Sequence, residues 1–310
     1  MLAFMKSIAL IIPYFGEFPE WTPLFFETIR RNPTIDFHFF TDCKYDKSIP
    51  DNAIMHHLSF DKYVKHANSF IDFDFAPPNA YKLCDLRPLF GLIHFDVIKD
   101  YDFYGWTDMD ILFGDIRSFY TADILNGYEI LSTHAHTISG HLALFKNKKQ
   151  HREQFKKIYN WKKALQNPEF VGIDEHGITN SYLYSFWEKA YYKFGLRSPK
   201  ALRNAVRKIK ARKIYLVEQY TTPFIQRPWL DGTVNSRQPD IWFYADGFIT
   251  NSRDKGKNFI YLHLMNFKSS TWRHDGTSAP WNDLDKIVHA TPDDMKIGIQ
   301  IDNSGIHPIK

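Results

Sequence analysis

The fold of this chain is set by an aromatic stretch that ends in two carboxylates, Tyr101-Asp-Phe-Tyr-Gly-Trp-Thr-Asp-Met-Asp-Ile-Leu-Phe-Gly-Asp115. Its first half is apolar enough to be a buried strand. In an extended chain, residues i and i+2 point the same way, so Asp108 and Asp110 can converge on one divalent cation while Met109 turns back into the protein. Two carboxylates rarely fill such a coordination sphere, and the rest goes to water or phosphate. The stretch therefore predicts a metal site that serves a nucleotide.

The segments before this stretch indicate the fold class. Apolar runs predict strands at Lys6–Phe15, Ile35–Thr41 and Ala53–Leu58, with a helix at Trp21–Arg31 after the first strand. This order is typical of a parallel, Rossmann-like nucleotide-binding half. The absence of Gly-x-Gly-x-x-Gly disfavours a dinucleotide site. The same patterns predict further helices at Tyr81–Asp100, Asp115–Asn126 and Lys148–Gln166, and further strands at Tyr128–Thr133, Leu142–Phe145, Val217–Ile225, Ile241–Thr250 and Phe259–Leu264. Pro88 indicates that the first turn of the helix 81–100 is irregular or that the helix begins there.

Three charged residues near the start of the predicted helix 81–100 are candidate ligand contacts. Lys82 and Arg87 bracket Asp85, shortly before the carboxylate pair. Two cations around an acid are suited to a diphosphate and a base or ribose. The alternative is a set of surface ion pairs.

A loop rich in histidine precedes the strand at 142–145. His134, His136 and His141 lie within eight residues, but with no acid or Cys nearby in the sequence they make a poor tetrahedral zinc set. A Ser139-Gly140-His141 loop that brings backbone close to a ligand is the more economical interpretation.

An acid pair and a late histidine complete the candidate residues. Asp174 and Glu175 follow Gly172 at a predicted helix start, where a carboxylate is commonly a cap but can also act as a base toward a hydroxyl. His263 lies in an apolar strand, where a core role is common, and Lys268 follows shortly after it.

Composition restricts the class of protein. The 310 residues and 36.6 kDa suit one large α/β domain, and an aromatic content of 17% suits a dense core or sugar-stacking surfaces. Cys43 and Cys84 form no CxxC, so we expect neither a disulfide framework nor structural zinc, and we expect a reducing compartment. The apolar run Ile8–Ile12 is too short to span a membrane. Residues 197–213 hold eight cations and no acid, which favours contact with anionic lipid or a solvated helix face.

Five motifs carry a resemblance to a known family. The chain resembles bacterial glycosyltransferases of the GT-A fold, of the kind encoded in lipopolysaccharide and capsule clusters. The motifs are Lys82-Leu-Cys-Asp85-Leu-Arg87-Pro-Leu-Phe-Gly91, Tyr104-Gly-Trp-Thr-Asp108-Met-Asp110-Ile-Leu-Phe-Gly-Asp115, Ser139-Gly140-His141, Asp174-Glu175-His176 and His263.

The resemblance implies roles for these residues. A divalent metal, Mn²⁺ or Mg²⁺, is expected on Asp108, Asp110 and His263. One carboxylate of the acid pair is expected to deprotonate the acceptor, as in inverting members, and the order Asp174-Glu175 leaves open which one. The expected donor contacts are Lys82, Asp85, Arg87, Asp108, Ser139, Gly140, His141 and Lys268.

The resemblance also implies a fold, a substrate and a place in the cell. We expect a mixed Rossmann-like sheet flanked by helices in one domain, with a donor-binding half at about 1–145, an acceptor-side half at about 146–275 and a tail at 276–310. The expected reaction moves a hexose such as galactose from a UDP-sugar to a glycan or lipid-linked saccharide of O-antigen or capsule. The expected location is cytoplasmic, with peripheral contact to the inner face of the inner membrane through 197–213.

Three alternatives remain at this point. A retaining glycosyltransferase of the same fold would need no base at 174–175. A metal-dependent phosphohydrolase would use the same Asp pair but ordinarily wants more acids or histidines around two metals. A carbohydrate-binding protein would explain the aromatics but not the charged residues before the metal motif. Nucleic-acid binding is disfavoured because the basic segment lacks interleaved aromatics.

Overall fold

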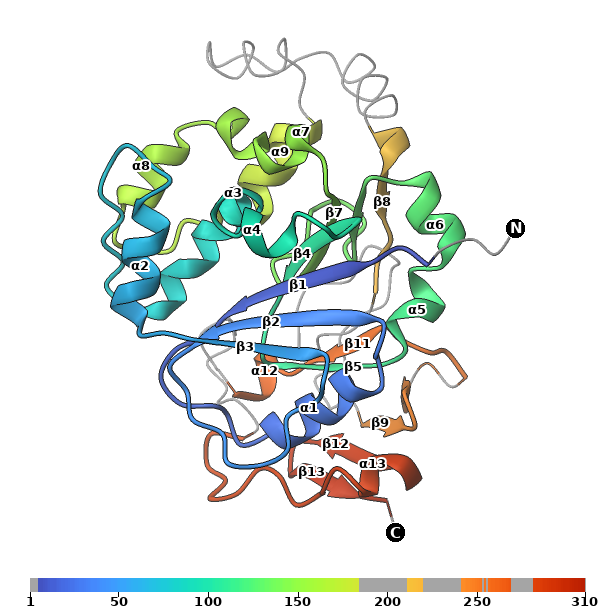
Figure 1. Cartoon of the computed structure of the whole chain (residues 1–310). Coiled ribbons are helices and arrows are strands. Elements are labelled where there is room, and N and C mark those ends of the chain that lie inside the picture. The colour runs from blue at the N-terminus through green and yellow to red at the C-terminus, as the bar shows by residue number, and fades with distance from the viewer. Residues whose placement is uncertain are drawn as a thin grey trace.

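A large mixed sheet forms the centre of the protein (Figure 1). The structure is a computed structural model. It describes residues 5–183, 211–219, 241–252, 254, 256–268 and 281–309. Within these residues the sheet has the strand order β3-β2-β1-β4-β7-β6-β8. Its strands are β1 (Ile8–Pro13), β2 (Ile35–Thr41), β3 (Ala53–His57), β4 (Phe103–Thr107), β6 (Ile130–Ser132), β7 (Leu142–Lys146) and β8 (Ile214–Leu216).

Strand direction changes at the middle of this sheet. The four strands β3, β2, β1 and β4 run parallel, whereas β7 is antiparallel to both β4 and β6. The carboxyl end of β4, where the carboxylate pair begins, therefore lies where the parallel half meets an antiparallel strand. Ligands of open α/β sheets commonly bind at the carboxyl ends of strands. The predicted mixed α/β fold is confirmed.

Both faces of the sheet are covered because side chains alternate along each strand. Ile8, Leu10 and Ile12 of β1 face one core together with α1 (Thr22–Arg30). Ala9 and Ile11 face the other core. That second core contains residues of α2 (Phe60–Asn68), α3 (Phe90–Ile93), α4 (Phe95–Ile98), α8 (Trp161–Gln166) and α9 (Ile178–Leu183), which Figure 1 shows on the side of the sheet opposite α1.

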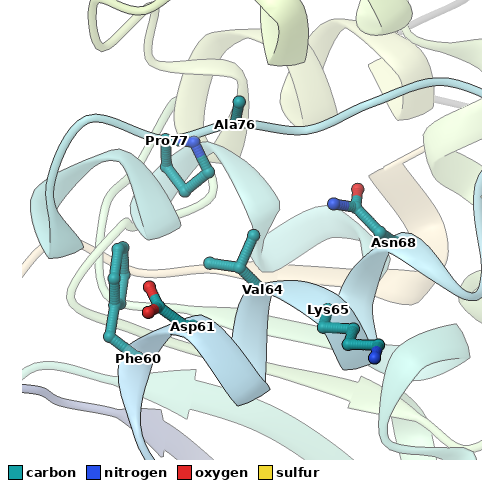
Figure 2. A pocket seen from close by; sticks show the side chains of 7 residues that line it. All are labelled: Phe60, Asp61, Val64, Lys65, Asn68, Ala76 and Pro77. Atoms are coloured by element: carbon teal, nitrogen blue, oxygen red, sulfur yellow. The ribbon is translucent and has the colours of Figure 1, made fainter.

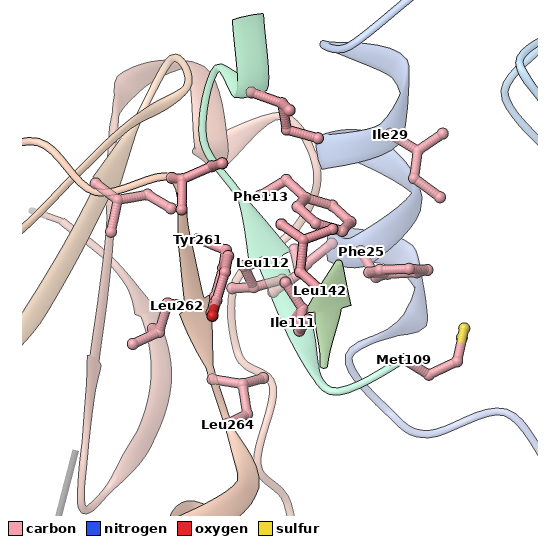
Figure 3. Packing of buried hydrophobic residues seen from close by; sticks show 14 of the residues in the cluster. Phe25, Ile29, Met109, Ile111, Leu112, Phe113, Leu142, Tyr261, Leu262 and Leu264 are labelled. Atoms are coloured by element: carbon pink, nitrogen blue, oxygen red, sulfur yellow. The ribbon is translucent and has the colours of Figure 1, made fainter. Parts of the chain in front are cut away.

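The C-terminal part of the chain supplies the late histidine. β5 (Ile111–Phe113) pairs antiparallel with β11 (Tyr261–His263). Figure 3 shows Phe25 and Ile29 of α1 beside Phe113 of β5, and the rings of Phe25 and Phe113 lie 5.9 Å apart. This pairing joins the segment after the carboxylates to the segment that carries His263.

A second sheet has the order β10-β9-β12-β13. The residues predicted as a C-terminal tail contribute two of its strands, because β12 pairs with both β9 and β13. The elements are β9 (Trp242–Ala245), β10 (Phe248–Asn251), α13 (Asp294–Ile297), β12 (Ile299–Asp302) and β13 (Gly305–Pro308). The predicted strand 241–250 is in fact the hairpin β9–β10, which turns at Asp246 (φ 48°) and Gly247 (φ 84°).

Two of the predicted long helices are broken for local reasons. The predicted helix 81–100 is a 3₁₀ helix, η1 (Ala80–Leu89), followed by α3 and α4. Pro88 lacks an N–H and disfavours the α conformation at the residue before it. The predicted helix 115–126 divides into α5 (Ile116–Phe119) and α6 (Ala122–Gly127), because the Thr121 hydroxyl caps a new start by accepting the Ile124 N–H.

The third predicted helix and one predicted strand also differ. The predicted helix 148–166 divides into α7 (Lys149–Arg152), η2 (Gln154–Lys157) and α8, with Asn160 in the left-handed region (φ 54°) before α8. Residues 217–219 follow β8 without forming a strand, and the rest of the predicted strand 217–225 lies outside the described residues. Among the described residues, no helix combines the length and apolar character that a membrane span requires.

Candidate functional site

Asp108 and Asp110 lie between the end of β4 and the start of β5, and the sheet pairing brings His263 to them. The Leu264 N–H donates to the Asp110 backbone oxygen (2.7 Å), and Nε2 of His263 lies 3.4 Å from Oδ2 of Asp110. One ligand atom from each of Asp108, Asp110 and His263 lies within 4.8 Å of the other two. Two carboxylates and an imidazole at this spacing fit a divalent ion such as Mn²⁺.

The turn that carries the two carboxylates is fixed from both sides. The Trp21 indole N–H donates to the Met109 backbone oxygen (2.9 Å), and the Asp108 N–H donates to the His141 backbone oxygen (3.3 Å). Met109 is buried and Asp110 is 6% exposed, whereas Asp108 is half-buried. Met109 thus turns into the protein as the spacing predicted.

Arg87 joins three of the predicted motifs. Its Nη1 donates to the Gly140 backbone oxygen (2.5 Å) and to Oδ2 of Asp174 (2.9 Å), and its Nη2 pairs with Oδ1 of Asp108. The guanidinium is largely buried, so these charge-assisted bonds are stronger than exposed ones. The side chain connects the carboxylate pair, the Ser-Gly-His loop and the acid pair.

The acid pair lies at a helix start, as predicted, in a short π-helical turn, η3 (Ile173–Gly177), that leads into α9. Burial raises the pKa of Asp174 to about 7, although Arg87 opposes the shift. Glu175 is half-buried, and its Oε1 accepts the Gly140 N–H (3.0 Å). A Cβ on Gly140 would lie 2.8 Å from this oxygen, so a larger residue there would move the Glu175 carboxylate away from the loop.

Lys82 and Asp85 are structural rather than exposed. Both side chains are at most 1% exposed, so the interpretation as surface ion pairs is wrong. Nζ of Lys82 donates to Asp85 (2.8 Å) and to the backbone oxygens of Ala164 (2.8 Å) and Glu169 (2.7 Å), which uses all three of its donors. Asp85 accepts the backbone N–H groups of residues 171, 172 and 173. The pair therefore holds the segment before Asp174 in place, and neither residue has a charge left to offer a diphosphate.

The Ser139-Gly140-His141 loop packs against the end of β4. The Ser139 hydroxyl accepts the N–H groups of His141 (3.2 Å) and Leu142 (3.3 Å), and the Trp106 indole donates to the Ser139 backbone oxygen (3.0 Å). The rings of His141 and His263 stack with centroids 4.3 Å apart. Ser139 thus stabilises the loop, while His141 lies against a candidate metal ligand.

Several predicted residues lie at or beyond the edge of the described chain. Lys268 is the last residue of α12 (Met265–Lys268), which follows β11. Of the basic segment, 197–210 lies outside the described residues, and Ala211–Lys213 form a short turn before β8.

A pocket on α2 is not part of this group of residues. Figure 2 shows its lining, which α2 shares with the segment around Pro77. The residues are Phe60, Asp61, Val64, Lys65, Asn68, Ala76 and Pro77. None of these belongs to the predicted motifs.

Solved structures similar to this chain include three glycosyltransferases. Galactosyltransferase LgtC, in complex with donor and acceptor sugar analogs, is 12% identical over 64% of this chain and 83% of its own, with a TM-score of 0.33. Mouse xyloside xylosyltransferase 1 is 10% identical over 70% and 86% (TM-score 0.31). Glycosyltransferase GlyE of Streptococcus pneumoniae TIGR4 is 12% identical over 75% and 58% (TM-score 0.30). Likenesses this slight do not assign a function to this chain, and the geometry of the site is the basis for one.

Sequence comparison gives one informative result. No curated protein matches the chain. The model of a family of unknown function (DUF6625) matches residues 10–283, which include every motif described above.

Proposed function

This chain belongs to a family of unknown function (DUF6625), and we propose that it is a metal-dependent glycosyltransferase of the GT-A kind. The observation that carries the proposal is the convergence of side chains from four elements, β4, β11, η1 and η3. Asp108 and Asp110 follow β4, His263 ends β11, and Arg87 connects the carboxylates to the acid pair of η3. Inverting glycosyl transfer from a nucleoside diphosphate can use such a set, because a cation neutralises the leaving group and a base takes the proton of the nucleophile.

The donor side of the proposed site consists of the candidate metal ligands and Arg87. Asp108, Asp110 and His263 would hold Mn²⁺ or Mg²⁺, and a bound ion would neutralise charge on the diphosphate of the leaving group. Arg87 supplies a guanidinium beside Asp108, which suits planar contacts with phosphate oxygens. The Gly140 backbone borders the same space, since its carbonyl accepts from Arg87.

The acceptor side consists of Asp174 and Glu175. Both carboxylates approach Gly140, since a Cβ there would lie 2.8 Å from Oε1 of Glu175 and 3.2 Å from Oδ2 of Asp174. A base in this position could deprotonate the acceptor hydroxyl, which supports a transfer that inverts the anomeric carbon. A transfer that retains the configuration is the alternative. We propose a UDP-hexose, such as UDP-galactose, as donor and a glycan or lipid-linked saccharide of O-antigen or capsule as acceptor. Contact with the inner membrane through 197–213 remains part of the proposal.

Amide variants of the two acids identify the base. We expect Asp174→Asn or Glu175→Gln to lower kcat roughly 10²–10⁴-fold, because the amide removes basicity with little change of shape. The variant of the acid that is not the base should keep most activity. Asp174→Asn should in either case lower the free energy of unfolding by about 1.5–3 kcal/mol, because it weakens the bond to Arg87. Kinetics and the anomeric configuration of the product by NMR are the measurements. Normal turnover in both variants, or a product with the donor's configuration, would contradict inversion.

A donor screen tests the activity itself. Thermal unfolding is measured with each nucleotide sugar, with and without Mn²⁺, because a ligand that binds the folded state raises the unfolding temperature. We expect a shift that needs both the nucleotide sugar and the ion, and slow release of intact nucleoside diphosphate detected by ³¹P NMR. Release of inorganic phosphate or nucleoside monophosphate would instead identify a phosphohydrolase. Equal shifts in EDTA would contradict metal dependence.

A further inference from the structure

A second group of ligand-type side chains lies beside the first. His134 follows β6, His141 precedes β7, and Glu175 lies in η3. One ligand atom from each lies within 4.8 Å of the other two. The sequence argued against zinc because the histidine loop has no acid nearby, and the fold supplies that acid as Glu175, 35 residues beyond Gly140.

A buried nitrogen in this group has no partner within the described residues. His141 is 6% exposed, and its Nε2 makes no hydrogen bond to any of them. A buried polar atom in that state is unfavourable, because it has lost its hydrogen bonds to water without replacing them. A cation bound by the ring would remove this cost, because an imidazole nitrogen is a common ligand of transition metals.

The surroundings of His134 match those of a metal-binding imidazole. Its Nδ1 lies 3.3 Å from Oε1 of Glu218, and the other oxygen of Glu218 accepts the Ala135 N–H (3.2 Å). Histidines that bind metals usually hold a carboxylate or carbonyl on their other ring nitrogen, which sets the tautomer and orients the ring. Glu218 is held in that position by the backbone of the same loop.

From these contacts we infer that His134, His141 and Glu175 form a second cation site, of the class that binds Zn²⁺. Two imidazoles and one carboxylate are an established zinc set that leaves a position open to water or substrate. The oxygen-rich set at Asp108 and Asp110 suits Mg²⁺ or Mn²⁺ instead. The inference goes beyond the proposed glycosyl transfer and does not need it. A carboxylate that holds a cation is a weaker base, so occupancy would assign the base role to Asp174.

The test measures Zn²⁺ bound to the full chain by equilibrium dialysis, with excess Mg²⁺ to occupy the oxygen-rich set. We expect one Zn²⁺ per wild-type chain. His134→Ala and His141→Ala should each weaken binding more than tenfold, and Glu218→Gln about 10–100-fold. His136→Ala is the matched control, because His136 belongs to the same loop, is exposed and lies outside the group, so its variant should bind like the wild type.

Three outcomes would overturn the inference. The first is that neither the wild type nor His136→Ala binds Zn²⁺. The second is that the His134 and His141 variants, shown to be folded by circular dichroism, bind it normally. The third is that Asp110→Asn alone removes Zn²⁺, which would place the ion on the first set. Titration with Co²⁺ gives an independent readout, since strong visible absorption from a four-coordinate ion should appear in the wild type and in His136→Ala but not in His141→Ala. Failure of glycosyl transfer would change none of these results.

Discussion

Asp110→Asn is expected to lower turnover of the nucleotide sugar about a thousandfold and to abolish its dependence on Mn²⁺. The amide keeps the shape of the side chain but removes the charge that, with Asp108 and His263, would hold the ion. Metal ions contribute several kcal/mol of charge stabilisation, and a loss of about 4 kcal/mol corresponds to about three powers of ten in rate. Asp108→Asn should reduce turnover similarly, and it should also weaken the pair with Arg87.

The matched control for these variants is Asp115→Asn in the same stretch. Asp115 caps α5 by accepting the N–H groups of Arg117 and Ser118, and Asn caps a helix about as well. This variant should keep activity and stability. Measurements are nucleoside diphosphate release, Mn²⁺ affinity by calorimetry and circular dichroism for the fold. Full activity of Asp110→Asn, or of the wild type in EDTA, would refute the metal assignment.

Lys82→Met is expected to destabilise the protein by about 3–5 kcal/mol. Methionine fills nearly the same space, but it leaves Asp85 as a buried charge without its cation, and it leaves the backbone oxygens of Ala164 and Glu169 without their donor. Because Asp85 also binds the backbone before Asp174, we expect activity to fall with stability. Urea unfolding gives the free energy, and donor turnover at low temperature gives the activity.

Lys162→Met is the control for this second result. Lys162 pairs with Asp72 at 2.6 Å, but 48% and 72% of the two side chains are exposed. Exposed ion pairs contribute little to stability because water and salt screen them, so this variant should unfold close to the wild type. If Lys82→Met also unfolded within about 1 kcal/mol of the wild type, the pair with Asp85 would not hold the η3 segment.

The strands of the parallel half and the carboxylate pair could be predicted from the sequence alone. The predicted strand 35–41 has the bounds of β2, because Ile35, Phe37 and Phe39 alternate with polar residues, and this period of two identifies a strand without reference to its neighbours. The position of the carboxylate pair was likewise predicted, because the buried strand β4 ends at Thr107, directly before Asp108. The segment from Met109 to Asp110 bends rather than continuing the extended chain. Pro88 correctly indicated the irregular start of the segment 81–100, because a proline marks such a break in the sequence itself. The predicted helix 148–166 was wrong as one continuous helix, because periodicity does not locate a break such as that at Asn160.

The partners of each charged side chain were decided by the tertiary structure alone. Lys82 and Asp85 have the same local sequence whether they face solvent or the core, and the contacts with residues 164–173 determine that they are buried. Arg87 meets Asp108 and Asp174 only because η1, β4 and η3 converge. The sequence by itself determined where the buried strands lie and which polar residues follow them. Packing of segments far apart in the chain determined which charges neutralise one another, because the energy of a buried charge depends on neighbours that no local pattern contains.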